Sequence, residues 1–462
     1  MSSPRSRVVG VDVARALALL GMMSVHLLPE VRDDGTLTPA FLLSAGRASA
    51  LFAVLAGVGL ALATGGHRTR LRPRGPVTAA TLTRAVLVTL VGLVLATLNP
   101  PVAVILANYG LLFAVGCVVL GPRPRTLLLT AAAWVATAPL ADHLLRLHLP
   151  PGPGDQPSLA TLGRPLEMLT HLALTGYYPV LLWAPYVLVG LALGRLRLDE
   201  RSTAVQIALV GVVLASAARV SSDVLLRNGG WQALTRSGPV DVLQPWLGLD
   251  QLQARGQYGV PPTTSWWWQA VASPHTGTAF DLAGTIGSAL VVLGVCLLLA
   301  QAAARTTSRR LAPSRWLVAG LAATGSMTLT LYSLHVVAAD QLAIGVAVDP
   351  AHRGRLLAVH MVAAMLLAAV WKAPAWSRWR TGAPHTQSRH AGSLPALAVG
   401  RRGPLEWLVA VVSTLAADSV GPCAPRTEPG PTPIGPSPAE VTDPAVRSRP
   451  TPPAKDARPS SE

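Results

Sequence analysis

The sequence predicts an all-α, polytopic integral membrane protein with about ten transmembrane helices. Of its 462 residues, 51% are hydrophobic and only 13% are charged. Apolar segments recur along most of the chain, and each is near the roughly 20 helical residues that cross a bilayer core of about 30 Å. Because lipid offers no hydrogen-bond partners to an exposed backbone, these segments must be helices.

Ten apolar segments account for the predicted crossings. We expect them at residues 9–28, 45–64, 79–98, 102–120, 126–146, 177–195, 202–225, 280–303, 316–345 and 353–373. The first segment contains Asp12 and Arg15 and lacks a small-residue cleavage site, so we interpret it as a retained helix rather than a signal peptide. The ninth is too long for one straight crossing and is expected to be tilted or broken near Gly325.

The placement of arginine predicts the orientation. The formal net charge is +16, and the arginines lie between the apolar segments, which favours a topology signal over nucleic-acid binding. With ten spans, the arginine-rich loops fall on one side, and these loops cover residues 66–78, 121–125, 195–201 and 304–315. The positive-inside rule places that side and both termini in the cytoplasm of a multi-pass protein of the cell membrane.

The chain is predicted to consist of four regions. Residues 1–225 hold seven predicted helices, and residues 226–279 form a Trp-rich extracytoplasmic loop. Residues 280–416 form a second transmembrane region that ends in an interfacial helix, and the Pro-rich tail 417–462 is expected to be disordered and cytoplasmic. The cysteines show neither metal-ligand spacing nor a disulfide framework, so no metal site is predicted; they are Cys117, Cys296 and Cys423.

Tryptophan is concentrated in the long extracytoplasmic loop. It contains Trp231, Trp246 and the run at residues 266–268. These side chains can anchor the loop at the membrane interface, or they can form a stacking platform for a sugar or a lipid headgroup. Both interpretations remain open from the sequence.

The first helix carries the most informative polar residues. Asp12 and Arg15 are three apart and can pair on one helix face. His26 follows Arg15 by eleven residues, which returns it to the same face about 16 Å further along the axis. The pattern is compatible with an interfacial Arg–Asp anchor and a snorkelling histidine. It is also compatible with a cationic phosphate contact joined to a general base across the bilayer, because ionisable groups in a membrane are costly.

This arrangement resembles the first helix of acyltransferase-3-type membrane acyltransferases. Residues 7–22, RVVGVDVARALALLGM, resemble the opening of bacterial heparan-α-glucosaminide N-acetyltransferase-like and YeiB-like proteins. Residues 325–332, GSMTLTLY, resemble the G-x-M-x-L-T-x-Y stretch of the YeiB-like C-terminal domain. Residues 402–407, RGPLEW, resemble the G-P-L-E-W element that closes that domain.

The resemblance implies a membrane acyltransferase that uses acyl-CoA, most simply acetyl-CoA, and modifies a cell-envelope saccharide or lipid. By this analogy His26 is the catalytic histidine, since the first outer loop, residues 29–44, contains no histidine. His335, which shares a face with Tyr332, is a second catalytic candidate. Arg15, Asp12 and Arg47 are the candidates for binding the acyl-CoA cosubstrate.

Three further polar residues are candidates for the site, and two other functions are compatible with the sequence. His275 and Asp281 mark the outer entrance of the eighth predicted span, His360 lies in the outer half of the tenth, and Asp281 could orient an imidazole. A transporter or flippase for a small amphiphile is the first alternative, with Arg15 and Arg47 as substrate contacts, although no internal repeat is evident. A non-catalytic membrane protein is the second. Membrane lipids are expected partners, and the sequence does not indicate an oligomeric state.

Overall fold

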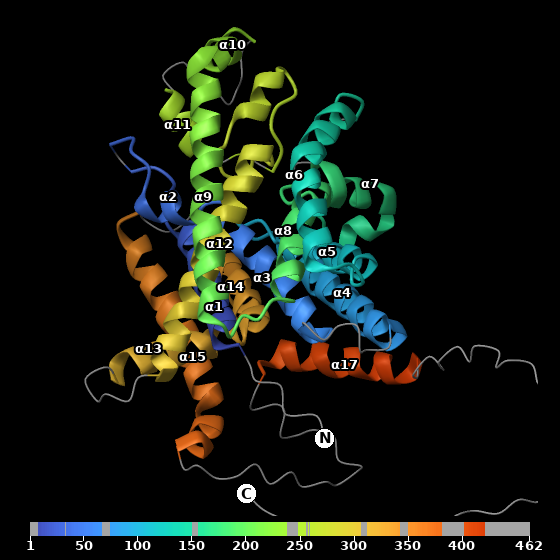
Figure 1. The fold of residues 1–462 in the computed structure, drawn as a ribbon, viewed down its shortest axis with the longest axis vertical. Helices are drawn as coiled ribbons and strands as arrows, with labels where there is room; N and C mark the ends of the chain where they lie inside the picture. Colours follow the sequence, from blue (N-terminus) through green and yellow to red (C-terminus); the bar gives the residue numbers. More distant parts are fainter. Residues whose placement is uncertain are drawn as a thin grey trace, which may run out of the picture. The chain divides into compact units, whose positions relative to one another are not determined.

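Helices make up the regular structure of the chain (Figure 1). The computed structural model describes residues 8–32, 34–66, 74–149, 156–237, 248–255, 257, 259–305, 312–341, 350–380 and 402–420. These residues contain one isolated β-bridge, between Val31 and Leu37, and no strand. Trp246, the arginines within 67–73 and 306–311, and the predicted tail beyond Val420 lie outside the described residues.

The described residues contain sixteen α-helices, and short 3-10 or π-helical turns join some of them. The first eight are α1 (Val9–Leu27), α2 (Pro39–Ser44), α3 (Arg47–Ala63), α4 (Arg74–Ala96), α5 (Leu106–Val118), α6 (Pro124–Arg146), α7 (Pro165–Thr170) and α8 (Val180–Leu193). The others are α9 (Arg201–Leu225), α10 (Trp231–Arg236), α11 (Leu249–Ala254), α12 (Ala279–Arg305), α13 (Ala312–Gly325), α14 (Thr328–Gln341), α15 (Pro350–Arg380) and α17 (Pro404–Val420).

The helices confirm an all-α multi-pass membrane protein but not the count of ten. Seven helices of the described residues are long and apolar enough to cross a membrane, or up to nine if each of two bent pairs is one span. The predicted span that is missing from this count is the fourth, because α5 has only 13 residues. At 1.5 Å per residue it is about 20 Å long, which is short of a bilayer core.

The ninth predicted span is broken at the expected place. Its two parts, α13 and α14, meet at a bend of 74° just after Gly325. A Cβ atom at Gly325 would lie 1.7 Å from the carbonyl oxygen of Asp12, so only glycine lets α13 approach α1 this closely. The prediction of a break near Gly325 is confirmed, and the break lies where α13 packs closely against α1.

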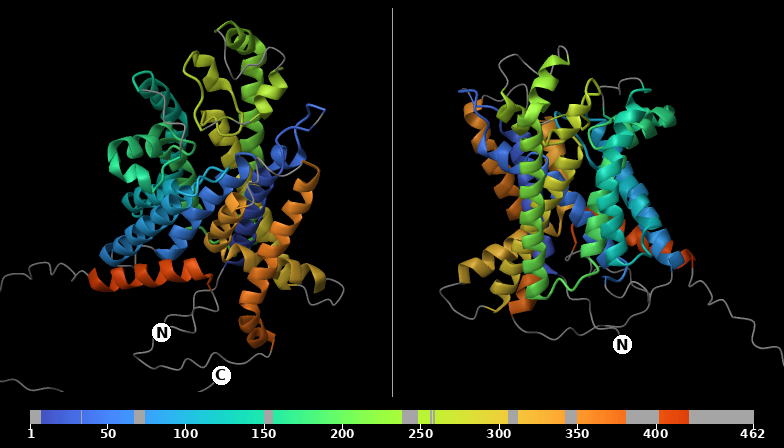
Figure 2. Two further views of the ribbon diagram at one scale, coloured as in Figure 1. Left: turned by 180° about the vertical axis from the view of Figure 1, so that it is seen from behind. Right: turned by 45° about the horizontal axis from the view of Figure 1, so that its top comes forward.

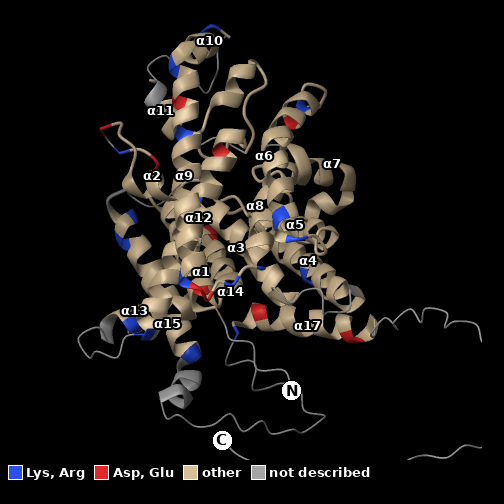
Figure 3. Ribbon diagram, in the orientation of Figure 1, with Lys and Arg blue, Asp and Glu red and all other residues tan. Residues whose placement is uncertain are grey.

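Helix α1 lies in the centre of the bundle. It contacts α3, α12, α13, α14 and α15, and Ala14, Ala16 and Leu19 are fully enclosed. Helix α9 packs along α12 and leaves Leu209 and Val213 exposed, as expected for side chains that face lipid. Figure 3 shows that uncharged residues dominate the middle of the bundle.

Helix α17 lies across one end of the bundle, where α1 and α9 begin (Figures 1 and 2). We call this the α17 end and the other the opposite end. Because α17 runs to Val420, the first four residues of the predicted tail, 417–420, are helical. At the opposite end, the segment between α9 and α12 has its own small core, which includes Leu226, Leu252 and Trp268.

Candidate functional site

Three histidines from distant parts of the chain meet inside the bundle. His26 lies in the last turn of α1, His335 on α14 and His360 on α15. The Nδ1 atom of His26 lies 3.1 Å from Nε2 of His335, and the two rings stack with centroids 5.3 Å apart. The His360 ring stands edge-on to His335, with centroids 5.6 Å apart. His26 and His335, the two predicted catalytic residues, are therefore direct neighbours.

The hydrogen bond between His26 and His335 limits what each ring can do. Two neutral imidazoles share such a bond only if one supplies an N–H and the other a lone pair. If His26 Nδ1–H donates, Nε2 of His26 keeps its lone pair and can accept a proton. His335 then carries its hydrogen on Nδ1, a buried atom without a hydrogen-bond partner in the described part of the chain. Only this tautomer makes His26 a base, with His335 as the group that orients it.

Burial distinguishes the three rings. His335 is 3% exposed, whereas His26 and His360 are half-buried. His360 Nδ1 donates to the carbonyl oxygen of Leu356 at 2.9 Å, which fixes its tautomer and leaves Nε2 free. Of these rings, His26 therefore combines an orienting partner with an accessible edge. Within the described ranges, no three His, Cys, Asp or Glu side chains are grouped so that they could hold a metal ion.

His275 lies close to this cluster but belongs to an aromatic enclosure. Its ring contacts Tyr177, Tyr178 and Trp183, with centroids 4.8, 5.7 and 6.3 Å away. Burial, with a smaller effect from nearby His26, lowers the pKa of His275 to about 4. His275 is therefore neutral at pH 7 and adds no positive charge beside His26.

Asp281 has a capping role in the structure. Its Oδ2 accepts a hydrogen bond from the Gly277 N–H at 2.9 Å, and Thr278 Oγ1 accepts one from the Asp281 N–H at 3.1 Å. These bonds fix the turn that starts α12. The carboxylate is thus engaged by the backbone, and the expectation that it orients an imidazole has no hydrogen bond to support it among the described contacts.

The other end of α1 carries a cationic site. Arg15 Nη1 lies 3.1 Å from Asp12 Oδ1, as the three-residue spacing predicts, and the Arg15 side chain is 26% exposed. Two further arginines, Arg84 on α4 and Arg402, lie nearby. The positive charges of Arg402 and Arg15 both act on Arg84. Sequence reasoning missed Arg84 and Arg402. Arg84 had a signal, since it is an ionisable residue inside an apolar segment.

Arg47 lies at the opposite end of the bundle from this cationic site. It starts α3, twelve residues before Gly59, and a Cβ atom at Gly59 would lie 2.5 Å from Arg15 Nη2. Twelve helical residues rise roughly 18 Å, so Arg47 and Arg15 are not brought together. Arg47 instead borders a cavity of about 250 Å³, whose lining also includes Arg219 and Asp281.

The tryptophan run divides between core and surface. Trp268 is fully buried, and Trp267 packs against Gly230. Trp266 is 51% exposed and packs against His143 with the two rings tilted by 34° and their centroids 4.1 Å apart. Trp266 is thus the member of this run that is best placed to stack on a ligand or anchor at an interface, whereas Trp268 stabilises the fold.

Comparison with known proteins finds one family. Residues 7–223 match the family model described as "Heparan-alpha-glucosaminide N-acetyltransferase, catalytic". The matched part runs from the start of α1 nearly to the end of α9 and contains Asp12, Arg15, His26 and Arg47. His335, Arg402 and α17 lie beyond it. No curated protein and no solved structure matches the chain.

Proposed function

Residues 7–223 belong to the heparan-α-glucosaminide N-acetyltransferase-like family, and from this we propose that the chain is an acetyl-CoA-dependent membrane acetyltransferase. The proposed acceptor is a saccharide or lipid of the cell envelope. The observation that carries the proposal is the contact of His26 with His335, because α1, the helix that carries His26, presents Arg15 at its other end. One helix thereby offers a base and a phosphate contact.

The α17 end is suited to the donor. Acetyl-CoA carries its phosphates and its thioester at opposite ends of an extended molecule. Guanidinium groups bind phosphate through paired hydrogen bonds, and Arg15, Arg84 and Arg402 concentrate positive charge here. The rise of about 16 Å from Arg15 to His26 separates the phosphates from the reacting centre. We place this end in the cytoplasm, where the positive-inside rule assigns the arginine-rich loops.

His26 acts as the general base in this proposal. Its Nε2 accepts the proton of an acceptor hydroxyl or amine while the acceptor oxygen or nitrogen attacks the thioester carbonyl carbon. The new C–O or C–N bond forms, the C–S bond breaks, and the leaving sulfur receives the proton from His26. His335 holds the His26 ring in the required tautomer. Arg47 and its cavity lie at the opposite end, on the side from which an acceptor would arrive.

Replacement of His26 tests the function. We expect His26→Ala to lower transfer of radiolabelled acetyl groups from acetyl-CoA to envelope extract by about 10²- to 10⁴-fold, the usual contribution of a general base. Binding of acetyl-CoA should be retained, because the Arg15 end is unchanged. His148→Ala, at an exposed histidine outside the cluster, is the matched control. Equal transfer by His26→Ala and wild type would exclude His26 as the base.

A transporter for a small amphiphile is the second candidate. Two bent helix pairs favour it, because interrupted helices often form the substrate sites of transporters. In such sites the free N-terminus of a half-helix contacts an anionic substrate. Here Glu406 of the chain itself occupies the N-terminus of α14, which weakens this candidate. A wild-type protein that binds no acetyl-CoA and transfers no label would favour transport.

A further inference from the structure

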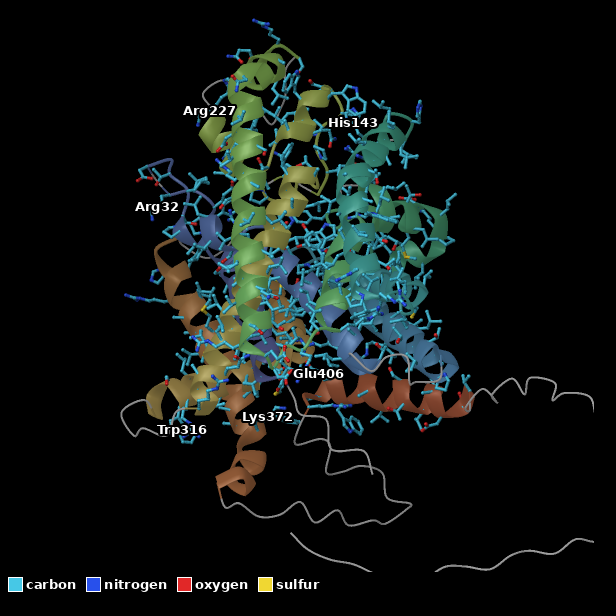
Figure 4. The ribbon with its side chains drawn as sticks, viewed as in Figure 1. Arg32, His143, Arg227, Trp316, Lys372 and Glu406 are labelled. Atoms are coloured by element: carbon cyan, nitrogen blue, oxygen red, sulfur yellow. The ribbon has the colours of Figure 1, made fainter. Side chains whose placement is uncertain are left out.

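Two sequence motifs that the proposed reaction does not use are docked on each other. The G-P-L-E-W element at the start of α17 meets the start of α14 (Figure 4 labels Glu406). Glu406 Oε1 accepts hydrogen bonds from the N–H groups of Leu329 and Thr330 at 2.7 and 3.1 Å. Glu406 Oε2 accepts one from Thr330 Oγ1 at 2.6 Å, and that hydroxyl accepts one from the Leu405 N–H at 3.2 Å.

These bonds provide acceptors for backbone N–H groups at the start of α14, which the helix break would otherwise leave without partners. The first N–H groups of a helix have no partner within it, and the 74° bend after α13 leaves those of α14 without a preceding turn. A carboxylate satisfies such groups and also interacts favourably with the helix dipole. The motif glycine is explained as well, because a Cβ atom at Gly403 would lie 2.2 Å from Glu406 Oε2.

The capped helix is the one that carries His335. Thr330 precedes His335 by five residues on a continuous helix, a rise of about 7.5 Å. Because the bend separates α14 from α13, the position of α14 depends on the contacts that α14 itself makes with the rest of the bundle. At its start these are the bonds to Glu406, and further along Tyr332 accepts a long hydrogen bond from the Ile105 N–H at 3.4 Å. A shift at the start of α14 would therefore move His335 relative to His26.

We propose that Glu406 is a positioning residue, which caps α14 and thereby holds His335 against His26. The C-terminal helix α17 then sets the geometry of the histidine pair, although it lies outside the residues matched by the acetyltransferase family. The catalytic part of this inference rests on the proposed function; the structural part does not. The two parts can be tested separately.

Hydrogen–deuterium exchange of the full-length protein in detergent tests the structural part. We expect Glu406→Ala to accelerate exchange not only at Leu329 and Thr330 but also onward to His335, where the amide bonds are internal to α14. Glu406→Gln should largely restore protection, because its carbonyl oxygen can still accept both N–H groups. Asp418→Ala, which removes an exposed acid of the same helix, is the control. Unchanged exchange, or faster exchange only at residues 329 and 330, would overturn the positioning role.

Steady-state acetyl transfer tests the catalytic part. We expect Glu406→Ala to lower kcat by about 10²-fold, as a misplacement near 1 Å does, while KM for acetyl-CoA stays close to wild type. The pH profile of kcat should shift, since His26 loses its partner, and Glu406→Gln should return both towards wild type. Thr330→Val, which removes two of these bonds, and Thr330→Ser, which retains them, replace the first pair if Glu406→Ala yields little folded protein.

The outcomes separate this inference from the proposed function. A wild type without acetyl transfer refutes the function, and the exchange experiment still decides whether α14 depends on Glu406. An active wild type with wild-type kcat and pH profile in Glu406→Ala refutes the positioning role even where exchange is faster.

Discussion

Gly57 and Gly59 stand two residues apart on α3 and meet neighbours of different kinds. A Cβ atom at Gly57 would lie 2.4 Å from the carbonyl oxygen of Val187, in the backbone of α8. A Cβ atom at Gly59 would lie 2.5 Å from the guanidinium of Arg15. Backbone cannot yield without moving a helix, whereas the end of an arginine side chain can rotate away. A substitution at Gly57 therefore tests helix packing, whereas a substitution at Gly59 tests the placement of the Arg15 charge.

Alanine at each glycine makes a matched pair. Gly57→Ala should lower the free energy of unfolding by about 1–3 kcal/mol through overpacking. Gly59→Ala should leave it within about 1 kcal/mol, because alanine favours helix, but should weaken acetyl-CoA binding by displacing the Arg15 guanidinium. Thermal unfolding in detergent and equilibrium binding measure the two effects. Wild-type binding by Gly59→Ala would argue against Arg15 as a phosphate contact.

At the same scale, the sequence identifies candidate residues but not how they pair. The Asp12–Arg15 pair follows from helical spacing alone. The contact between His26 and His335 spans 309 residues of sequence, and no local pattern encodes it. Arg402 joins Arg15 and Arg84 only because α17 docks on the bundle, so its role depends on tertiary structure.

At the scale of elements, the end of α8 holds a loop between two other helices. The Arg195 guanidinium donates to the carbonyl oxygens of Pro122 and, at 2.6 Å, Leu120, which join α5 to α6. Arg195 is 8% exposed. Two residues later, the side chain of Arg197 is 65% exposed and pairs with Glu200 at 2.8 Å. Both arginines belong to one predicted topology signal, but only the first is built into the fold.

Substitution of these two arginines should give different results. Arg195→Ala removes charge-assisted hydrogen bonds from a buried guanidinium to two backbone carbonyl groups and should lower the free energy of unfolding by about 1.5–3 kcal/mol. Arg197→Ala removes an exposed ion pair and should cost at most about 1 kcal/mol. Thermal unfolding in detergent compares them. Equal losses would mean that the hydrogen bonds of Arg195 contribute no more than the exposed ion pair of Arg197.

Most helices were predictable as elements, because a long apolar run has few alternatives in lipid. The break near Gly325 was also predictable, since the run exceeds one crossing. The length of α5 was not: residues 102–105 are apolar, but they lie before the first residue of α5, Leu106. Hydropathy does not distinguish an apolar approach segment from the helix that follows it.

At the scale of the whole molecule, contacts near the ends of helices show which ends lie together. The hydrogen bonds of Arg195 join the end of α5 to the end of α8. A Cβ atom at Gly75, at the start of α4, would lie 3.4 Å from Val420 at the end of α17. The chain therefore leaves the α17 end along α4 and returns to it by the end of α5. The segment from 97 to 118 serves as the return, although α5 alone is too short to span.

Cysteine labelling in the full-length chain tests this return and the proposed orientation together. After replacement of Cys117, Cys296 and Cys423 by serine, a membrane-impermeant maleimide should label Leu98→Cys in intact cells. It should label Arg123→Cys only after permeabilisation, because residue 123 then lies in the cytoplasm beside the α17 end. Both positions are exposed, so access is set by the membrane. Labelling of both from the same side would mean that residues 97–118 do not cross. Labelling of Arg123→Cys alone in intact cells would invert the orientation and remove the cytoplasmic donor site from the proposed reaction.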